Sequence, residues 1–251
     1  MPDPRQHNPQ GPTFDNQMIE LDSVDSTNNY AMGRIHAGLA FDGLICLARY
    51  QWAGKGQRGK TWKAEPGQNL LMSLVVEPSF LKISNQFLLS AATALGILEM
   101  VGDQAKEKWT IKWPNDIYWG DRKAAGILIE NILRGESWTW AVVGIGVNLN
   151  QESFPTEVPH AISLKQITGT NYEPRELARV LAAAIQGKIK LLRKDPERIL
   201  KEFNGSLYKK NQPLILALGN ERINTTIQNV DALGKLHTDH GSFDIGEVRY
   251  V

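Results

Sequence analysis

Arg49-Tyr50-Gln51-Trp52-Ala53-Gly54-Lys55-Gly56-Gln57-Arg58-Gly59-Lys60-Thr61-Trp62 is the stretch on which the fold assignment of this 251-residue chain depends. It follows an apolar run from Gly43 to Ala48 that is typical of a strand, and its three glycines alternate with basic side chains. Glycine lets backbone N–H groups approach an anion closely, and lysine and arginine add positive charge. The stretch therefore predicts a loop that holds phosphate.

The same loop matches the P-loop pattern G-x4-G-K-[ST] from Gly54 to Thr61. That pattern works only where its lysine and hydroxyl residue open a helix whose N-terminus faces the phosphates. Here Pro66-Gly67 marks a turn shortly after the loop, and Asn69 to Val76 is an apolar run typical of a strand. A P-loop nucleoside triphosphatase is therefore disfavoured.

The remaining pattern predicts an α+β fold. Consecutive strands joined by short turns indicate antiparallel hairpins, which excludes the strand–helix alternation of a Rossmann or flavodoxin fold. These strands are predicted over Lys108–Trp113, Ile117–Trp119, Lys123–Leu133 and Trp138–Val147. Apolar periodicity predicts helices over Asn28–His36, Ser84–Met100, residues 172–193 and Pro196–Phe203. After about residue 211 the chain changes to short strands: Pro213–Leu218, Arg222–Val230, Leu233–Thr238 and Phe243–Tyr250.

Composition limits the class of protein. With 42% apolar residues the chain can bury a core, and 28 basic against 27 acidic residues disfavour a nucleic-acid binder. Cys46 is the only cysteine, which excludes a disulfide framework and predicts a small buried side chain in a reducing compartment. Neither a membrane helix nor a signal peptide is recognisable, so we expect a soluble, cytoplasmic protein. Residues 1–17 are polar and aperiodic, and they predict a flexible tail.

Five stretches in this order resemble the biotin protein ligase family: Asp25-Ser26-Thr27-Asn28-Asn29, Gly54–Trp62, Lys112-Trp113-Pro114-Asn115-Asp116, Lys123–Glu130 and Gly144–Asn150. The resemblance covers about residues 20–251. It implies a mixed, largely antiparallel sheet with flanking helices, of the class II aminoacyl-tRNA synthetase and biotin ligase type, over residues 18–208. It also implies a small SH3-like β-barrel over residues 209–251. Because the segment before Asp25 is too short for a winged helix, we expect the short form of the family, without DNA binding.

The resemblance implies an ATP-dependent ligase that activates biotin as biotinyl-5'-AMP and transfers it to a lysine of a biotin carboxyl carrier protein. The implied catalytic residues are Lys123, Arg58 and Lys112. The implied biotin-binding residues are Ser26, Thr27, Asn28, Gln51, Gly54, Lys55, Gly56, Gln57, Lys123, Gly126 and Gly144. The implied ATP and adenylate contacts are Lys55, Gln57, Arg58, Lys60, Trp62, Asn115, Asp116, Lys123 and Asn148. Magnesium is expected with ATP, with Asp116 as its candidate ligand, and a homodimer is expected because sheet-edge dimers occur in the family.

Some residues also have simpler interpretations. Asp25-Ser26 is typical of a helix N-cap, Trp62 could anchor the loop to the core, and Pro114-Asn115-Asp116 is ordinary turn chemistry. Gly144 and Gly146 interrupt a strand, which suggests a ligand or a second backbone close by. For each of these residues, both a structural role and a ligand-binding role stay open.

The sequence of the loop differs from the commoner family motif, Gly-Arg-Gly-Arg-Arg-Gly-Arg. Lys55, Gln57 and Lys60 replace arginines, and neither lysine nor glutamine offers the bidentate fork of a guanidinium. We therefore expect the phosphate contacts to be distributed differently in this chain. Two rival functions stay open: a lipoate or octanoate ligase, and a non-enzymatic biotin sensor or carrier-binding module. A DNA-binding repressor is disfavoured, because it would need a domain that we do not expect in this chain.

Overall fold

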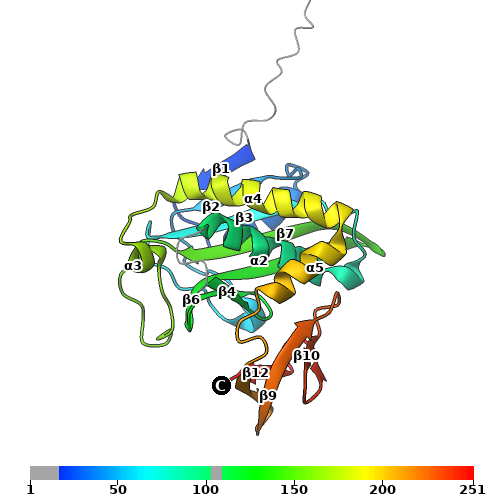
Figure 1. The fold of residues 1–251 in the computed structure, drawn as a ribbon. Coiled ribbons are helices and arrows are strands. Elements are labelled where there is room, and N and C mark those ends of the chain that lie inside the picture. The colour runs from blue at the N-terminus through cyan, green and yellow to red at the C-terminus, as the bar shows by residue number, and fades with distance from the viewer. Residues whose placement is uncertain (1–16, 103–108) are drawn as a thin grey trace, which may run out of the picture.

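The computed structural model describes residues 17–102 and 109–251, and its larger layer is a seven-stranded sheet with the order β1-β2-β3-β7-β6-β5-β4 (Figure 1). Only β1 and β2 pair in parallel, and every other neighbouring pair is antiparallel. The predicted mixed, largely antiparallel sheet is therefore confirmed. Its strands are β1 (Met18–Leu21), β2 (Ile45–Ala48), β3 (Asn69–Val76), β4 (Trp109–Lys112), β5 (Asp116–Trp119), β6 (Arg122–Arg134) and β7 (Ser137–Asn148).

Helices cover both faces of this sheet. Three helices, α2 (Phe87–Val101), α4 (Pro174–Lys194) and α5 (Pro196–Gly205), pack on one face and lie in front of the strands in Figure 1. The alternate side chains of β3, Leu70, Met72, Leu74 and Val76, bury against them, as the two-residue period of a strand requires. The other face carries α1 (Thr27–His36), which packs with Cys46 and Val75 in a second, smaller cluster.

Close packing of α2 on α4 is possible because of one glycine. A Cβ atom at Gly96 would lie 2.7 Å from the side chain of Ile185 and 2.9 Å from its Cα atom. The facing side of α4 is a stripe of buried apolar residues with helical spacing: Ala178, Leu181, Ala182, Ile185, Ile189 and Leu192. Two short 3₁₀ turns, η2 (Gln57–Gly59) and η3 (Ile83–Asn85), and the short helix α3 (Leu164–Thr168) complete this part.

The C-terminal part is a five-stranded antiparallel sheet with the order β11-β10-β9-β8-β12. Its strands are β8 (Pro213–Leu218), β9 (Glu221–Val230), β10 (Leu236–Thr238), β11 (Ser242–Phe243) and β12 (Val248–Tyr250). The SH3-like barrel expected here, and the domain boundary at residue 209, stay predictions. The apolar face of this sheet joins the main core: Leu216, Ile227 and Leu236 belong to the same buried cluster as α2 and α5.

Most predicted elements agree with the structure to within a few residues, but one strand was predicted wrongly. Residues 243–250 form β11 and β12, separated by a turn in which Gly246 has a φ of +87°. Phe243, Ile245, Val248 and Tyr250 give this stretch the apolar content of one strand, but their alternation shifts by one residue at the turn. Lys108, the predicted first residue of another strand, and residues 1–16 of the predicted tail lie outside the described residues.

Cys46 is fully buried in β2, and burial raises the pKa of its thiol to about 12. The prediction of a small buried side chain is confirmed. Because the thiolate is the reactive species, we expect Cys46 of the native protein to be inert toward Ellman's reagent at pH 8. Labelling should follow unfolding in denaturant; rapid reaction of the native chain would contradict this packing.

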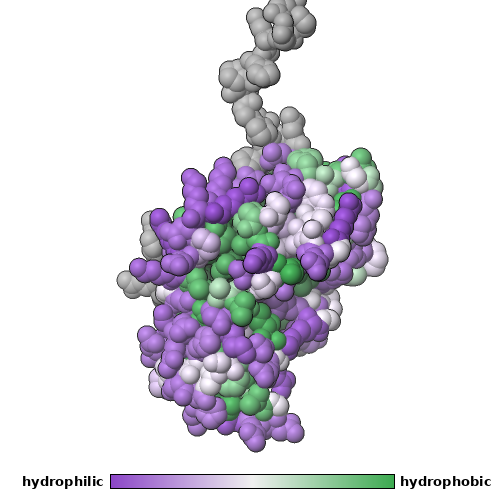
Figure 2. Space-filling view, turned by 90° about the vertical axis from the view of Figure 1, so that its right-hand side faces the viewer, coloured by the Kyte–Doolittle hydropathy of each residue, from purple (hydrophilic) through white to green (hydrophobic). Residues whose placement is uncertain are grey.

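One face of the molecule carries both apolar and polar surface. Figure 2 shows a face with apolar surface gathered near its middle and polar side chains around it. Among the described residues, no helix has the length and apolar character needed to cross a bilayer.

Candidate active site

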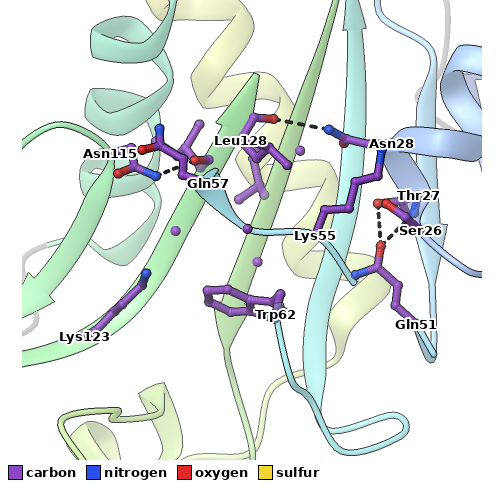
Figure 3. A pocket seen from close by; sticks show the side chains of 16 residues that line it. Ser26, Thr27, Asn28, Gln51, Lys55, Gln57, Trp62, Asn115, Lys123 and Leu128 are labelled. Atoms are coloured by element: carbon purple, nitrogen blue, oxygen red, sulfur yellow. Dashed lines mark hydrogen bonds between the residues drawn. The ribbon is translucent and has the colours of Figure 1, made fainter. Parts of the chain in front are cut away.

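A cleft lies over the centre of the seven-stranded sheet, between the start of α1, the glycine-rich loop and the strands β6 and β7 (Figure 3). It contains about 470 Å³ of empty space, part of which is open to solvent. Sixteen residues line it: Ser26, Thr27, Asn28, Gln51, Lys55, Gly56, Gln57, Trp62, Asn115, Lys123, Gly126, Ile127, Leu128, Gly144, Ile145 and Gly146.

The glycine-rich loop folds back on itself as a narrow hairpin. Lys55 and Thr61 form an isolated bridge, and the Gly56 N–H donates to the Lys60 carbonyl at 2.7 Å. The turn at its tip places Arg58 in the left-handed region, with a φ of 57°. No helix begins at Lys60-Thr61, and the next regular element is the strand β3. The structural context that a P-loop requires is therefore missing, and that interpretation is rejected.

One end of the cleft is a buried network of polar side chains. The Thr27 N–H and hydroxyl both donate to Gln51 Oε1, at 2.6 and 3.0 Å. The Ser73 hydroxyl lies 2.8 Å from Thr27 Oγ1 and 2.6 Å from Asn28 Oδ1. Thr27, Asn28 and Ser73 are each at most 3% exposed, so this network is held out of water. Such groups must be satisfied by protein or ligand partners.

The start of α1 does not use its side chains as a cap. Ser26 occupies the N-cap position but makes no capping hydrogen bond, and the Asp25 carboxylate accepts instead from the Asn29 side chain. That bond holds the pKa of Asp25 below its usual range. The predicted side-chain capping is therefore wrong, and the Ser26 side chain faces the cleft.

Glu130 connects this network to the loop. Its Oε2 accepts from the Asn28 side-chain amide at 2.7 Å, and its Oε1 pairs with Lys55 Nζ at 3.1 Å. One carboxylate on β6 thus contacts both Asn28, in the first turn of α1, and Lys55 of the glycine-rich loop.

Trp62 closes the loop and fills part of the cleft above two glycines. A Cβ atom at Gly146 would lie 2.4 Å from the Trp62 indole, and one at Gly126 would lie 3.0 Å from it. At Gly144 the neighbour is Asn28, whose Oδ1 would lie 2.3 Å from an added Cβ atom. In this structure the neighbours of Gly144 and Gly146 are these two side chains and not a second backbone, and a ligand beside the two glycines stays a prediction. The Trp62 indole N–H is buried without a partner among the described residues.

Lys123 stands at the opposite end of the cleft from Gln51 in Figure 3. Its Nζ pairs with Asp116 Oδ1 at 2.6 Å and lies 5.5 Å from the centre of the Trp62 ring. Its backbone is fixed by the neighbouring segment, since the Lys123 N–H donates to the His160 carbonyl at 2.6 Å. Asn148 supports the same strand, with its amide nitrogen 3.3 Å from the Lys123 carbonyl.

Lys112 lies apart from the cleft, in a cluster of tyrosines between the two sheets. Its Nζ lies 3.1 Å from the Tyr118 hydroxyl and within 4.7 Å of the Tyr250 ring centre. Burial lowers the pKa of Lys112, and it raises the pKa of Tyr118 to about 12. These groups are suited to structural contact between the sheets.

The structure brings together most of the predicted site residues, but five others lie outside the cleft lining: Arg58, Lys60, Lys112, Asp116 and Asn148. Gly54 is also outside it, and lines a neighbouring depression with Lys60 and Glu130. Sequence reasoning missed Ile127, Leu128 and Ile145 as lining residues, and Ser73 and Glu130 as members of the network. A lone serine inside the apolar run of β3 was the available signal for Ser73.

The sequence matches the model of the biotin/lipoate A/B protein ligase family over residues 20–148. It is also 33% identical over 170 residues to the biotin–[acetyl-CoA-carboxylase] ligase of Paracoccus denitrificans, covering 65% of this chain and 69% of the relative. The chain belongs to the biotin/lipoate A/B protein ligase family. Another relative is the bifunctional ligase/repressor BirA of Escherichia coli, 29% identical over 221 residues, with 86% of this chain and 67% of the relative covered.

Solved structures agree with this family assignment at the level of the fold. The biotin protein ligase from Aquifex aeolicus, in complex with biotin and ATP, superposes with a TM-score of 0.77 at 24% identity and covers 94% of this chain and 99% of its own. The expected biotin ligase type of catalytic fold is therefore confirmed. In the present chain, the five stretches that resemble the family all lie on strands of the seven-stranded sheet or on the segments that directly connect them.

Ser73 offers a test of the buried network. In Ser73→Ala, the buried Asn28 Oδ1 loses its hydroxyl donor and Thr27 Oγ1 loses a polar neighbour at 2.8 Å, so we expect a loss of about 1–3 kcal/mol in the free energy of unfolding. Urea denaturation would measure it. Ser84→Ala is the matched control, because the Ser84 hydroxyl is exposed, and an equal effect of the two substitutions would contradict the network.

Proposed function

We propose that this protein is an ATP-dependent ligase that activates biotin as biotinyl-5'-AMP and transfers it to a lysine of a biotin carboxyl carrier protein. One observation carries the proposal: the cleft joins a buried polar network at one end to the Lys123 ammonium at the other. The relatives named as biotin–[acetyl-CoA-carboxylase] ligases, from Paracoccus denitrificans and Mycobacterium tuberculosis, support the choice of substrate.

The polar end suits the ureido ring of biotin. That ring has two N–H donors and one carbonyl, all of which need partners when buried. Ser26, Thr27 and Gln51 offer hydroxyl and amide groups there, and the Gln51 amide nitrogen has no hydrogen-bond partner among the described residues. The apolar side chains of Leu128 and Ile145 would cover the thioether ring and the valeryl chain.

The cationic end suits the reacting carboxylate and phosphate. In the first step a carboxylate oxygen of biotin attacks the α-phosphorus of ATP, the bond to the bridging oxygen breaks, and pyrophosphate leaves. Both reactants are anionic, so fixed positive charge beside the developing bond lowers the barrier. Lys123 would supply it at the α-phosphate, and Lys55 and Lys60 from the loop would add to the field. Asn115, which also lines the cleft, would contact the nucleotide.

Magnesium would arrive with ATP. Mg²⁺ on nucleotides is usually bound by phosphate oxygens, waters and one or two carboxylates. Asp116 fits that pattern as a single carboxylate adjoining Lys123, and no group of three or more potential metal-binding side chains occurs within residues 17–102 and 109–251. We assign Asp116 as the candidate ligand, where the ion would neutralise phosphate charge.

In the second step the neutral amine of the acceptor lysine attacks the acyl carbon of the mixed anhydride. The amide bond forms, AMP leaves with the electron pair of the broken C–O bond, and the amine loses a proton. Until the acceptor arrives the anhydride must be kept from water, and we propose that the glycine-rich loop does this by closing further over the cleft.

Loop closure has a direct test. Biotin plus ATP should slow tryptic cleavage after Lys55 and Lys60, because the bound intermediate would hold the loop in place. Mass spectrometry of the early fragments would measure the rates, with biotin alone and ATP alone as controls. Unchanged cleavage at both bonds would count against closure.

Biotin-dependent ATP–pyrophosphate exchange tests the whole proposal, run beside lipoate and octanoate. Exchange with biotin alone would support the biotin ligase. Exchange only with lipoate or octanoate would transfer the assignment to the other branch of the family, and no exchange with any acid would favour a binding module.

We also propose that the protein is a homodimer, and light scattering would test this by measuring its molar mass in solution.

A further inference from the structure

Arg58 makes a contact that the phosphate-loop interpretation does not include. From the tip of the loop, its guanidinium donates to the Gly246 carbonyl at 2.8 Å through Nη1 and to the Ile245 carbonyl at 2.9 Å through Nη2. Both acceptors lie in the turn between β11 and β12, at the far end of the sequence. The loop that borders the cleft is therefore attached to the C-terminal sheet.

Internal hydrogen bonds hold the turn between β11 and β12 in a conformation that presents its carbonyl groups to Arg58. The Asp244 N–H donates to Glu247 Oε2 at 2.7 Å, and the Glu247 N–H donates back to the Asp244 carbonyl at 3.0 Å. Lys235 pairs with the Asp244 carboxylate at 3.0 Å. Both carboxylates of the turn are thus already engaged, which leaves two adjacent backbone carbonyls for the fork of donors that only arginine offers.

Gly246 provides the space for this contact. A Cβ atom there would lie 1.1 Å from Arg58 Nη2 and 1.5 Å from Cζ, so any side chain at this position would displace the guanidinium. The glycine and the arginine therefore fit as a pair.

We infer that the turn Asp244–Glu247 is a docking site for Arg58, and that the C-terminal sheet positions the glycine-rich loop at the cleft through it. Arg58 is a positioning residue: it acts through Gly56 and Gln57, the neighbouring loop residues that line the cleft. Its consequence for catalysis rests on the proposed function, whereas the docking of the loop does not.

Gly246→Ala tests the docking, with Gly219→Ala as its matched control. Both glycines lie in turns of the C-terminal sheet at positive φ, +87° and +58°, but Gly219 has no neighbouring atom within 4 Å of an added Cβ. We expect Gly246→Ala to speed tryptic cleavage after Lys60 about fivefold to tenfold, because the loop would lose the exposed charge-assisted hydrogen bonds of Arg58. Gly219→Ala should leave the cleavage rate unchanged. Equal rates in the two variants would overturn the inference.

A double-mutant cycle separates docking from general loosening. Arg58→Gln should also speed cleavage after Lys60, and combining it with Gly246→Ala should add nothing further, because both remove the same contact. Additive effects would overturn the inference. If Gly246→Ala fails to fold, as judged by circular dichroism, an unchanged cleavage rate in Arg58→Gln overturns it instead.

Pyrophosphate exchange then separates this inference from the proposed function. In an active ligase, Gly246→Ala should raise KM for ATP more than it lowers kcat, with Gly219→Ala at the wild-type values. If the wild-type chain shows no exchange, the proposed function fails while the cleavage rates still decide the docking. If the ligase is active but Gly246→Ala changes neither the cleavage rate after Lys60 nor KM for ATP, the docking inference alone is overturned.

Discussion

Replacing Lys123 by alanine is expected to lower biotin-dependent ATP–pyrophosphate exchange by about a hundredfold to a thousandfold, the usual effect of deleting one preorganised charge at a reacting group. The loss should fall mainly on kcat, because the ammonium stands at the end of the cleft opposite the polar network and would act on charge that develops during adenylation. Initial rates of labelled pyrophosphate incorporation at varied biotin would measure both constants.

The control for Lys123 is a lysine of equal charge elsewhere. Lys190→Ala removes an exposed cation from α4 and should leave exchange within error of the wild type. Lys123→Arg is expected to recover little activity, because a planar guanidinium cannot reproduce the compact ammonium paired with Asp116. Wild-type pyrophosphate exchange in Lys123→Ala would show that Lys123 has no part in adenylation.

Gly144→Ala is expected to raise the KM for biotin about tenfold to a hundredfold, because its Cβ atom would lie 2.3 Å from Asn28 Oδ1 and displace that side chain from its buried partners. Asn28 would then lose its contacts with Ser73 and Glu130, at 2.6 and 2.7 Å, and the polar end of the cleft would change shape. We also expect a loss of about 2 kcal/mol in the free energy of unfolding.

Gly187→Ala is the matched control. Gly187 lies within α4 with no neighbour inside 4 Å of an added Cβ atom, so the same substitution there should stabilise the helix by up to about 1 kcal/mol and leave KM unchanged. Similar kinetics for the two alanine variants would show that Asn28 is not positioned as described.

The sequence predicted those features that depend on local pattern. The apolar run Asn69–Val76 matched β3 to the residue, and the glycine-rich loop was placed at the cleft, because period and composition are visible along the chain. Ser73 was missed because a serine within such a run carries no mark of its partners, which come from the start of α1.

Contacts between distant segments could not be predicted in this way. Arg58 was expected at phosphate, yet its partners in this structure are two backbone carbonyls of the C-terminal sheet. A carbonyl group is present at every residue and so has no sequence signature. Lys112 was likewise expected in catalysis from its motif, whereas its tyrosine neighbours come from β5 and from two C-terminal segments. Direct roles for both residues stay predictions.

The shared core of the two sheets has a consequence for how the protein denatures. Trp113 donates its indole N–H to the Gly234 carbonyl at 2.9 Å, and Gly234 packs against Phe87 so closely that a Cβ atom there would lie 2.8 Å from the ring. Neither sheet can melt without exposing the apolar surface of the other. The described parts of the chain should therefore behave as one cooperative unit, with a single heat-absorption peak whose calorimetric and van't Hoff enthalpies agree.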